Sequence, residues 1–470
     1  MGGLQVAQNR PWVENLGMDT QNSTQEQLNK LIEFRQVVYD QFFTVRQDVQ
    51  SELLDALLVK GRVPSFPWLS TAGCFRREWA SLYDAVEEGR QDVAGLEQFL
   101  ARQVPDRGIQ YWALDVSPWA RVQARTLSER QYVYAPGRSF KGKPVVPGYG
   151  YSFLDWVPQA GESWSLAVSA ERVKPESSDL LVGAAQVKRL CEARSELSDL
   201  LDIVAGDCKY SQPEFLRGVQ GLPCGIVARL AKNRVLYGRP EPKSAGKRGR
   251  PRVHGDRFAF KEPETWGQPV EDDEFEHPKW GQVKLYRWTN LHGRSTADVE
   301  FDVLQAQVHL ERDKPPAPLW LLWLPPETMP TTLTLNVKTI WCAYDHRWPI
   351  EPGNRFRKQT LNWTSPQFQT PEQGDRWTIL VTLAFWQLYL ARPLVADCPL
   401  PWQPKQTKLT PDRVQQGWVD IFLQIGQPSR PPQRRGNSPG WPKGKPRQPK
   451  KRYRVVKKSA KSPKSTRKTA

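Results

Sequence analysis

Residues 1–104 carry hydrophobic side chains at helical spacing. Between Ser23 and Gly61 the apolar positions return every three or four residues, which predicts a long amphipathic helix. Ser23 and Glu26 fit a capping box at its start, and Gly61 ends it. Two shorter helical patterns follow before residue 105. This predicts an α-helical N-terminal region that either binds DNA or only packs, since no helix-turn-helix spacing decides between the two.

Residues 105–237 change to a pattern of short apolar runs separated by glycine and proline. Runs of this length predict strands, and an amphipathic helix over 177–194 and a short one over 212–219 lie among them. The predicted strands cover 109–116, 130–136, 151–158, 164–173, 200–207 and 225–231. Strands mixed with helices in this order predict a mixed sheet flanked by helices, the α/β class.

Residues 238–317 begin rich in Gly, Pro and Arg and continue with strands of alternating polarity. This segment is too long for a simple connection, so we expect an inserted, mostly β subdomain. Residues 318–428 return to buried elements, with an apolar strand over 318–325 and helices over 373–394 and 410–426. The longest apolar stretch lies in the first of these helices and is interrupted by Thr and Gln, which favours a buried helix over a membrane span.

The positive charge of the chain lies almost entirely at its C-terminal end. The formal net charge is +17, from 67 basic and 50 acidic residues. Residues 430–470 hold 16 Lys or Arg and no acid, so the rest of the chain is nearly neutral. Such a run is typical of a disordered segment that binds polyanions, and we expect a disordered basic tail over 429–470. The alternative is a tail that only aids solubility.

Cysteine spacing and the N-terminal residues bear on the compartment. The six cysteines form no Cys-x-x-Cys pair, which argues against a structural zinc site. The first ten residues have no apolar core of the kind that a signal peptide needs. We therefore expect an intracellular protein in a reducing compartment, without a membrane segment.

Three acidic residues occupy positions where a metal site could form. Asp115 and Asp207 each close an apolar strand, and Glu351 opens a helix. Acids at the carboxyl ends of neighbouring strands face one crevice, where their like charges would repel. Divalent cations remove that repulsion, and Mg²⁺ prefers oxygen ligands while keeping waters that phosphate can replace. Taken singly, each acid is more simply explained as a turn or cap residue.

The residues around Glu351 form a spaced pattern. Tyr344, Arg347, Glu351 and Lys358 are separated by two, three and six residues. Alone, the pattern also fits a salt-bridged helix surface, because Arg347 and Glu351 are four apart. Together with the two strand-end acids and the β-rich insertion, it resembles the DDE transposases of bacterial insertion sequences. The resemblance covers about 105–395 and implies an RNase H-like core.

The resemblance implies a specific reaction and site. Asp115, Asp207 and Glu351 would hold two Mg²⁺ ions, with Mn²⁺ as a substitute. Water would first nick the transposon end, and the exposed 3′-hydroxyl would then attack target DNA. The DNA contacts would come from five residues beside the third acid: Tyr344, Arg347, Arg355, Arg357 and Lys358. Guanidinium groups grip phosphate bidentately, and an ammonium group acts as a point charge.

The resemblance also implies partners and a location. Double-stranded DNA would be bound both at the transposon ends and at the target, with the helical region over 1–104 helping to recognise the ends. A homodimer would form when two ends are synapsed. A bacterial chain of this kind would lie in the cytoplasm, with the nucleoid.

Two features leave alternatives open. Lys209 stands two places after Asp207, where relatives usually have Gly or Ala, so Asp202 is a rival for the second acid. Asp202 lies within the predicted strand and Asp207 ends it, which favours Asp207.

Two other functions also fit the residues. One is a related metal-dependent DNA nuclease without strand transfer, and the other is a non-enzymatic nucleic-acid-binding protein that acts through its basic tail.

Overall fold

The computed structural model divides the chain into two compact units. The helical unit joins Met1–Val93, Phe356–Pro366 and Ile379–Asn437, and the sheet unit joins Ala94–Arg355, Gln367–Thr378 and Ser438–Ala470. The structure describes residues 13–135, 137, 140, 142–197, 199–241, 250, 252–309, 316–333, 335–433, 440, 442–446 and 448–457.

The first long helix of the helical unit is interrupted, unlike the single predicted helix. Helix α1 (Val13–Val37) starts before Ser23 and passes through a π-helical turn (η1, Val38–Phe42) into a three-residue strand (β1, Phe43–Val45). Helix α2 (Gln47–Lys60) then begins after Arg46, whose φ of 59° is left-handed. Strand β1 pairs with β2 (Arg90–Gln91). The β-branched Thr44 and Val45 favour this extended pairing over helix continuation.

Helix α2 forms the centre of the helical unit. Most of its length is buried, and Leu53 and Leu57 have no exposed surface. The buried Arg35 donates to Asp55 at 2.7 Å and to the Gln387 side chain at 2.6 Å, so its charge is compensated inside the core. The remaining elements of this unit are η2 (Phe66–Thr71), α3 (Ser81–Glu87), α10 (Pro411–Gln416) and α11 (Trp418–Ile425).

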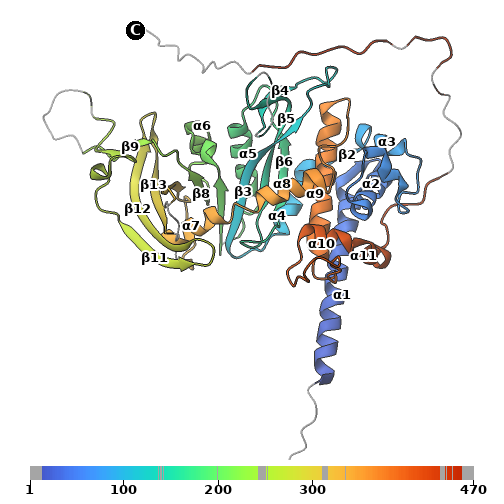
Figure 1. Ribbon diagram of the computed structural model, residues 1–470, viewed down its shortest axis with the longest axis horizontal. Coiled ribbons are helices and arrows are strands. Elements are labelled where there is room, and N and C mark those ends of the chain that lie inside the picture. Colours follow the sequence, from blue (N-terminus) through green and yellow to red (C-terminus); the bar gives the residue numbers. More distant parts are fainter. Residues whose placement is uncertain are drawn as a thin grey trace, which may run out of the picture. The chain divides into compact units, whose positions relative to one another are not determined.

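The sheet unit contains a mixed sheet of twelve strands with helices against it (Figure 1). Five strands run in the spatial order β6-β5-β3-β7-β8. Strand β5 runs antiparallel to both β6 and β3, whereas β3, β7 and β8 run parallel to one another. This order matches the predicted RNase H-like core. Their bounds are β3 (Gly108–Ala120), β5 (Val145–Trp156), β6 (Leu166–Arg172), β7 (Leu200–Gly206) and β8 (Cys224–Arg229).

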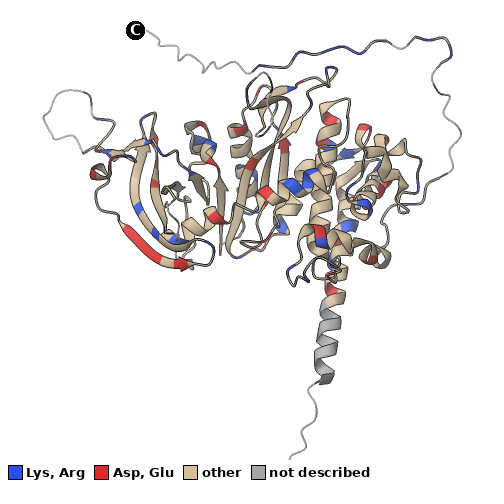
Figure 2. Cartoon of the chain, viewed as in Figure 1, with Lys and Arg blue, Asp and Glu red and all other residues tan. Residues whose placement is uncertain are grey.

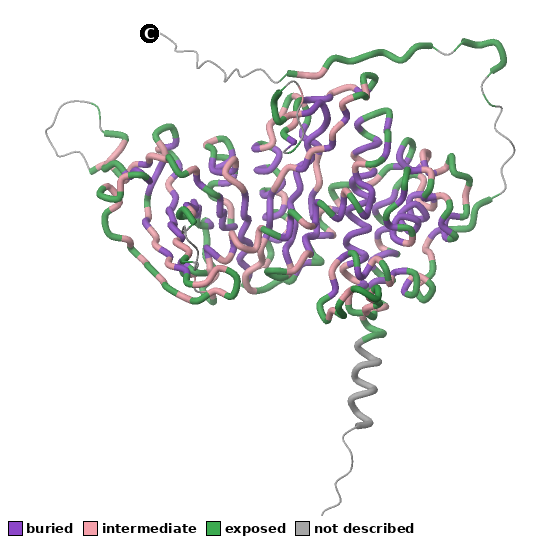
Figure 3. The backbone as a smooth tube through the Cα atoms, viewed as in Figure 1, coloured by how far each residue is buried: buried purple, intermediate pink, exposed green. Residues whose placement is uncertain are grey.

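Helices cover the core strands, whose central residues are buried (Figure 3). Helix α5 (Asp179–Ala193) packs against β5 and against the short α6 (Pro213–Val219). Helix α7 (Val337–Asp345) packs on β7 and β8. Helix α4 (Val93–Arg102) belongs to this unit apart from its first residue, whereas α8 (Ile350–Gln359) and α9 (Pro371–Ala391) each begin in the sheet unit and end in the helical unit.

The β-rich insertion continues the same sheet. Strand β14 (Leu319–Leu324) pairs with β8 on one side and with β13 (Thr296–His309) on the other. Strand β12 (Gly281–Gly293) pairs with β13 and with β11 (Glu271–His277), whose side chains are mostly acidic (Figure 2). The remaining elements are β9 (Val235–Tyr237), β10 (Arg257–Ala259) and η4 (Pro263–Thr265).

A short segment of the C-terminal tail is hydrogen-bonded to the sheet unit. Within 448–457, the Tyr453 amide donates to the Arg125 carbonyl at 2.8 Å. The Val456 amide donates to the Arg130 carbonyl at 2.7 Å, beside β4 (Gln131–Tyr134). The tail residues 434–439, 441, 447 and 458–470 lie outside the described residues. No helix in the described part of the chain is long and apolar enough to cross a bilayer.

Candidate active site

The sheet brings Asp115 and Asp207 side by side. Strands β3 and β7 run parallel, and their last paired residues are Leu114 and Gly206. The next residue on each strand is one of the two acids, so both carboxylates lie where this pairing ends. Strand β3 itself continues to Ala120, so the prediction that Asp115 ends its strand is wrong. The strand persists there because it remains paired with β5.

The turn after β7 fixes Asp207. Its side chain accepts a hydrogen bond from the Lys209 amide at 3.1 Å and caps the short η3 helix (Cys208–Ser211). Gly206 makes this turn possible, because a Cβ there would lie 2.5 Å from the buried ring of Tyr210. Asp115 is held in a similar way, since its Oδ1 accepts from the Val116 amide at 2.8 Å. Local backbone hydrogen bonds therefore orient both acids.

Burial and neighbouring charges act on Asp115 in opposite directions. Burial raises the pKa of Asp115, and the nearby negative charge of Asp207 raises it further, while Lys209 and Arg347 lower it. The Lys209 ammonium lies 3.9 Å from Asp115 Oδ1 and 3.5 Å from Asp179 Oδ2. Two protein cations thus offset the negative charge of the paired acids.

Arg347 links the third acid to the first two. Its Nη2 donates to Glu351 Oε1 at 3.3 Å, and its guanidinium lies 5.6 Å from the centre of the Tyr344 ring. Burial opposes the charge of Arg347, but the groups of Tyr344, Asp115, Glu351 and Asp207 together raise its pKa. Arg347 is therefore hydrogen-bonded to Glu351, and the negative charges of Asp115 and Asp207 also favour its charged form.

The donor set fits a divalent cation by its chemistry. Asp115 and Asp207 offer only carboxylate oxygens, the ligands that Mg²⁺ and Mn²⁺ prefer. Glu351 opens α8 as predicted and keeps 55% of its side chain exposed, but it is engaged by Arg347. Among the described residues, no three or more His, Cys, Asp or Glu side chains stand close enough together to hold a metal ion. Within the described residues, the structure brings Asp115 and Asp207 side by side but does not join Glu351 to them in one ligand cluster.

Asp202, the rival for the second acid, is part of the core. Its Oδ1 accepts from the Trp112 indole at 2.8 Å, and its Oδ2 accepts from Arg194 at 3.0 Å. Only 6% of the residue is exposed. Both of its oxygens are used inside the protein, which favours Asp207 as the acid available for chemistry.

The five expected DNA contacts differ in accessibility. Arg355 is exposed on α8, and Lys358 is half-buried with its ammonium 5.8 Å from the centre of the Trp363 ring. Arg357 has no exposed surface, and its guanidinium packs over Phe385 at 5.3 Å. We therefore exclude Arg357 from the candidate DNA surface, because its place on the buried face of α8 makes it a core residue. Tyr344 and Arg347 lie at the acids, as described above.

Sequence reasoning missed the role of Asp179 and noted Lys209 only as a departure. Asp179 opens α5 directly after the helix cap Ser178, and Lys209 lies between it and Asp115. The cap was readable in the sequence, because Ser178 followed by an acid is typical of a helix start. The approach of this helix start to Lys209 and the first acid depends on the packing of α5 and could not be predicted from the sequence.

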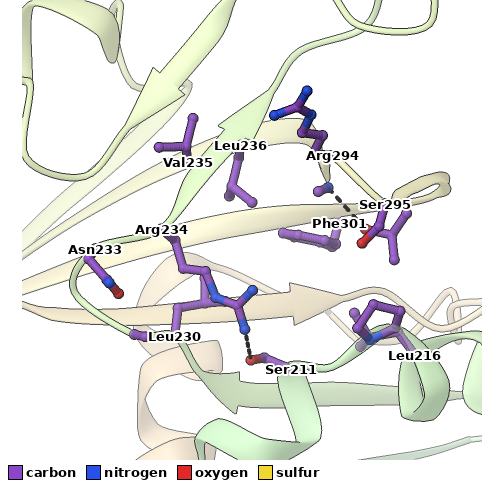
Figure 4. A pocket seen from close by; sticks show the side chains of 14 residues that line it. Ser211, Leu216, Leu230, Asn233, Arg234, Val235, Leu236, Arg294, Ser295 and Phe301 are labelled. Atoms are coloured by element: carbon purple, nitrogen blue, oxygen red, sulfur yellow. Dashed lines mark hydrogen bonds between the residues drawn. The ribbon is translucent and has the colours of Figure 1, made fainter. Parts of the chain in front are cut away.

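One cavity of the sheet unit has a volume of about 480 Å³ and is lined in part by Ser211, at the end of η3 (Figure 4). The candidate acids are not among its lining residues. Leu216, Leu236 and Phe301 line it with apolar surface, and Arg234 Nη2 donates to the Ser211 hydroxyl at 3.4 Å. The carboxylates themselves lie outside this cavity, so its volume says nothing about metal binding.

Comparison with protein families identifies a relationship for this chain. Residues 37–292, more than half of the chain, match the family model described as "DDE superfamily endonuclease". The matched segment includes Asp115 and Asp207, whereas Glu351 lies beyond its end. No curated protein matches the chain.

Proposed function

Because the chain belongs to the DDE superfamily of endonucleases, enzymes that act on DNA, we propose that it is the transposase of a bacterial insertion sequence. In this proposal it cuts the phosphodiester bond at each transposon end and joins the freed 3′-hydroxyl to target DNA. It acts as a homodimer that holds two ends, in the cytoplasm with the nucleoid.

One observation carries the proposal: two carboxylates stand at the end of the β3–β7 pairing, in a chain of this family. Asp115 and Asp207 would hold divalent Mg²⁺ or Mn²⁺, with Glu351 as the third ligand. When bound, such ions lower the pKa of water or hydroxyl and stabilise the leaving oxygen in an in-line displacement. The all-oxygen donor set and the partial burial of Asp115 agree with this assignment.

The protein's own residues would orient the DNA. Arg347 carries a guanidinium group, which is always protonated in proteins, so its fork of donors can grip a phosphate bidentately. Tyr344 packs against that guanidinium and limits its movement. On α8 the exposed Arg355 would contact the backbone, and Lys358 would reach it once its side chain leaves Trp363. Burial of Arg347 excludes water around it, which strengthens a contact with phosphate.

Three conservative substitutions test the catalytic assignment. We expect Asp115→Asn, Asp207→Asn and Glu351→Gln each to abolish metal-dependent cleavage of labelled end DNA while duplex binding and the circular dichroism spectrum stay unchanged. The control Glu192→Gln changes an exposed acid of α5 and should cleave as well as the native chain. Cleavage that persists in any one of the three variants would remove that residue from the site.

Two further assays separate the alternatives. A joining assay with pre-cleaved ends distinguishes a transposase from a metal-dependent nuclease that only cuts, because only the transposase forms a joined product. A non-enzymatic binding protein would show no metal-dependent cleavage in the native chain, and deletion of residues 430–470 would abolish its DNA binding. We expect the native chain to cleave and to join.

A further inference from the structure

A segment of the basic tail is hydrogen-bonded to an edge of the catalytic sheet. Among the described strands, β4 lies at one end of the sheet order and pairs with the single strand β5. Gln131, at the start of β4, forms a parallel bridge with Val456 of the tail. The amides of Tyr453 and Val456 donate to the carbonyls of Arg125 and Arg130. The tail thus satisfies backbone groups beside an edge strand, which otherwise face water.

A buried arginine ties the tail to the loop before β4. Arg130 is only 3% exposed, and its guanidinium donates to the main-chain carbonyls of Leu127, Arg121 and Val122 at 3.1–3.4 Å. A further donor of the same guanidinium reaches the Tyr453 carbonyl at 3.2 Å. The tail's carbonyl therefore belongs to the hydrogen-bond set of a buried cation. Loss of this partner would leave a costly unpaired donor, so docking has a defined energetic basis.

The docked segment presents only positive charge to solvent. Within 448–457, five cationic residues are exposed, whereas Val455 and Val456 are half-buried against the sheet unit. The Lys450 side chain also contacts Gln369, and Lys451 lies 5.2 Å from the centre of the Tyr453 ring. No acid occurs anywhere in 430–470 to neutralise these charges. The segment combines an anchored backbone with a solvent-facing row of cations.

We propose that residues 448–457 are a docking strand that fixes this row of cations on the sheet unit as a contact for the phosphate backbone of duplex DNA. The inference rests on the proposed function, which makes DNA the substrate. A free tail would lose conformational entropy each time it bound DNA, whereas a docked one is already ordered and loses less. An acidic protein partner is the other polyanion that such a row could bind, but the DNA substrate of the family favours DNA.

Two sets of variants separate docking from charge. Val456→Pro removes the amide that donates to Arg130 and leaves the charge unchanged, and Val456→Ala keeps that amide as the matched control. The triple variant Lys451→Gln, Arg452→Gln and Arg454→Gln removes charge from the docked segment. Its control is Lys461→Gln, Lys464→Gln and Lys468→Gln, which removes equal charge from the end of the chain.

The first measurement is amide hydrogen exchange of the full chain without DNA or metal. We expect the Tyr453 and Val456 amides to exchange at least about tenfold more slowly than in an unstructured peptide, and Val456→Pro to remove the protection of Tyr453. The second is duplex affinity as a function of salt, without divalent ions. The docked-segment triple variant should lower the slope of log K against log salt by about 2.7, since each lost phosphate contact removes about 0.9.

Val456→Pro should reduce that slope and the affinity nearly as much as the triple variant, whereas Val456→Ala and the terminal triple variant should each have a smaller effect. Unprotected amides, or native DNA affinity in Val456→Pro, would overturn the proposal in favour of a free polycation. Protected amides with unchanged DNA binding in the docked-segment triple variant would also overturn it and indicate another partner. Neither readout involves cleavage. A failure of the docking-strand proposal is therefore distinguishable from a failure of the proposed metal site.

Discussion

Replacing Lys209 should increase the affinity of the site for divalent metal. The Lys209 ammonium lies 3.9 Å from Asp115 Oδ1, where it competes with any other cation for that carboxylate. At this distance, two unit charges attract by about 4 kcal/mol at an effective dielectric constant of 20 and by about 1 kcal/mol in water. Both side chains keep roughly a quarter of their surface exposed, which moves the value toward the lower figure. We take about 1.4 kcal/mol, a tenfold change in affinity.

The measurement is Mn²⁺ binding to the DNA-free chain, followed by calorimetry or by the resonance signal of the free ion at a fixed pH near 8. We expect Lys209→Ala to lower the dissociation constant for Mn²⁺ about tenfold, which corresponds to about 1.4 kcal/mol. Lys209→Arg keeps the positive charge and should bind the ion as the native chain does. Lys188→Ala removes a lysine from the exposed face of α5 and serves as the matched control for loss of one charge.

Unchanged or weaker Mn²⁺ binding in Lys209→Ala would refute this reasoning. It would mean that the ion does not use Asp115, or that the lysine helps to order the site. The Lys209→Arg variant separates these outcomes, because an ordering role that depends on the length and shape of lysine would fail there too. Tighter binding in Lys188→Ala of the same size would show that only the net charge of the chain matters.

Three further outcomes follow from buried groups. Arg357→Ala should lower the free energy of unfolding by about 3 kcal/mol in chemical denaturation, whereas the exposed Arg355→Ala should leave it unchanged. Asp202→Asn should destabilise the chain by about 3 kcal/mol, because Arg194 then keeps a buried charge without its counter-ion; native stability would show that this pair is not needed. Burial, with the charge of His254, lowers the pKa of His292, so the unfolded state binds more protons near and below pH 6.5. Thermal stability should therefore fall on acidification through that window, and His292→Gln should flatten the curve.

The alternation of apolar runs and turn residues predicted the RNase H-like core well. The predicted strands over 109–116, 151–158, 164–173, 200–207 and 225–231 each overlap a core strand of the sheet. The prediction succeeds there because each buried strand is a local run of apolar residues in the sequence, with glycine or proline near its ends. The placement of Asp207 directly after its strand was also readable, because the apolar run stops at Gly206.

Features that depend on packing between segments far apart in the chain could not be predicted from the sequence. The predicted single helix is broken at Arg46 because β1 pairs with residues 90–91, a contact across more than forty residues. The pairing of the predicted inserted, mostly β subdomain with the core sheet also could not be predicted, because β14 connects them by pairing with β8 on one edge and with β13 on the other. Arg357 looked like a surface cation because charge alone says nothing about which face of α8 is covered.

The double pairing of β14 has a mechanical consequence. Four of its residues, Leu321 to Leu324, are registered with β8, and five, from Leu319 to Trp323, are registered with β13. Swinging the insertion away from the core would require a whole row of backbone hydrogen bonds to rupture together, each contributing about 1 kcal/mol. Hinge bending between β8, β14 and β13 would therefore be too costly a way for the enzyme to admit its substrate. Adjustment must come instead from rotating side chains and from the connecting loops at the rim.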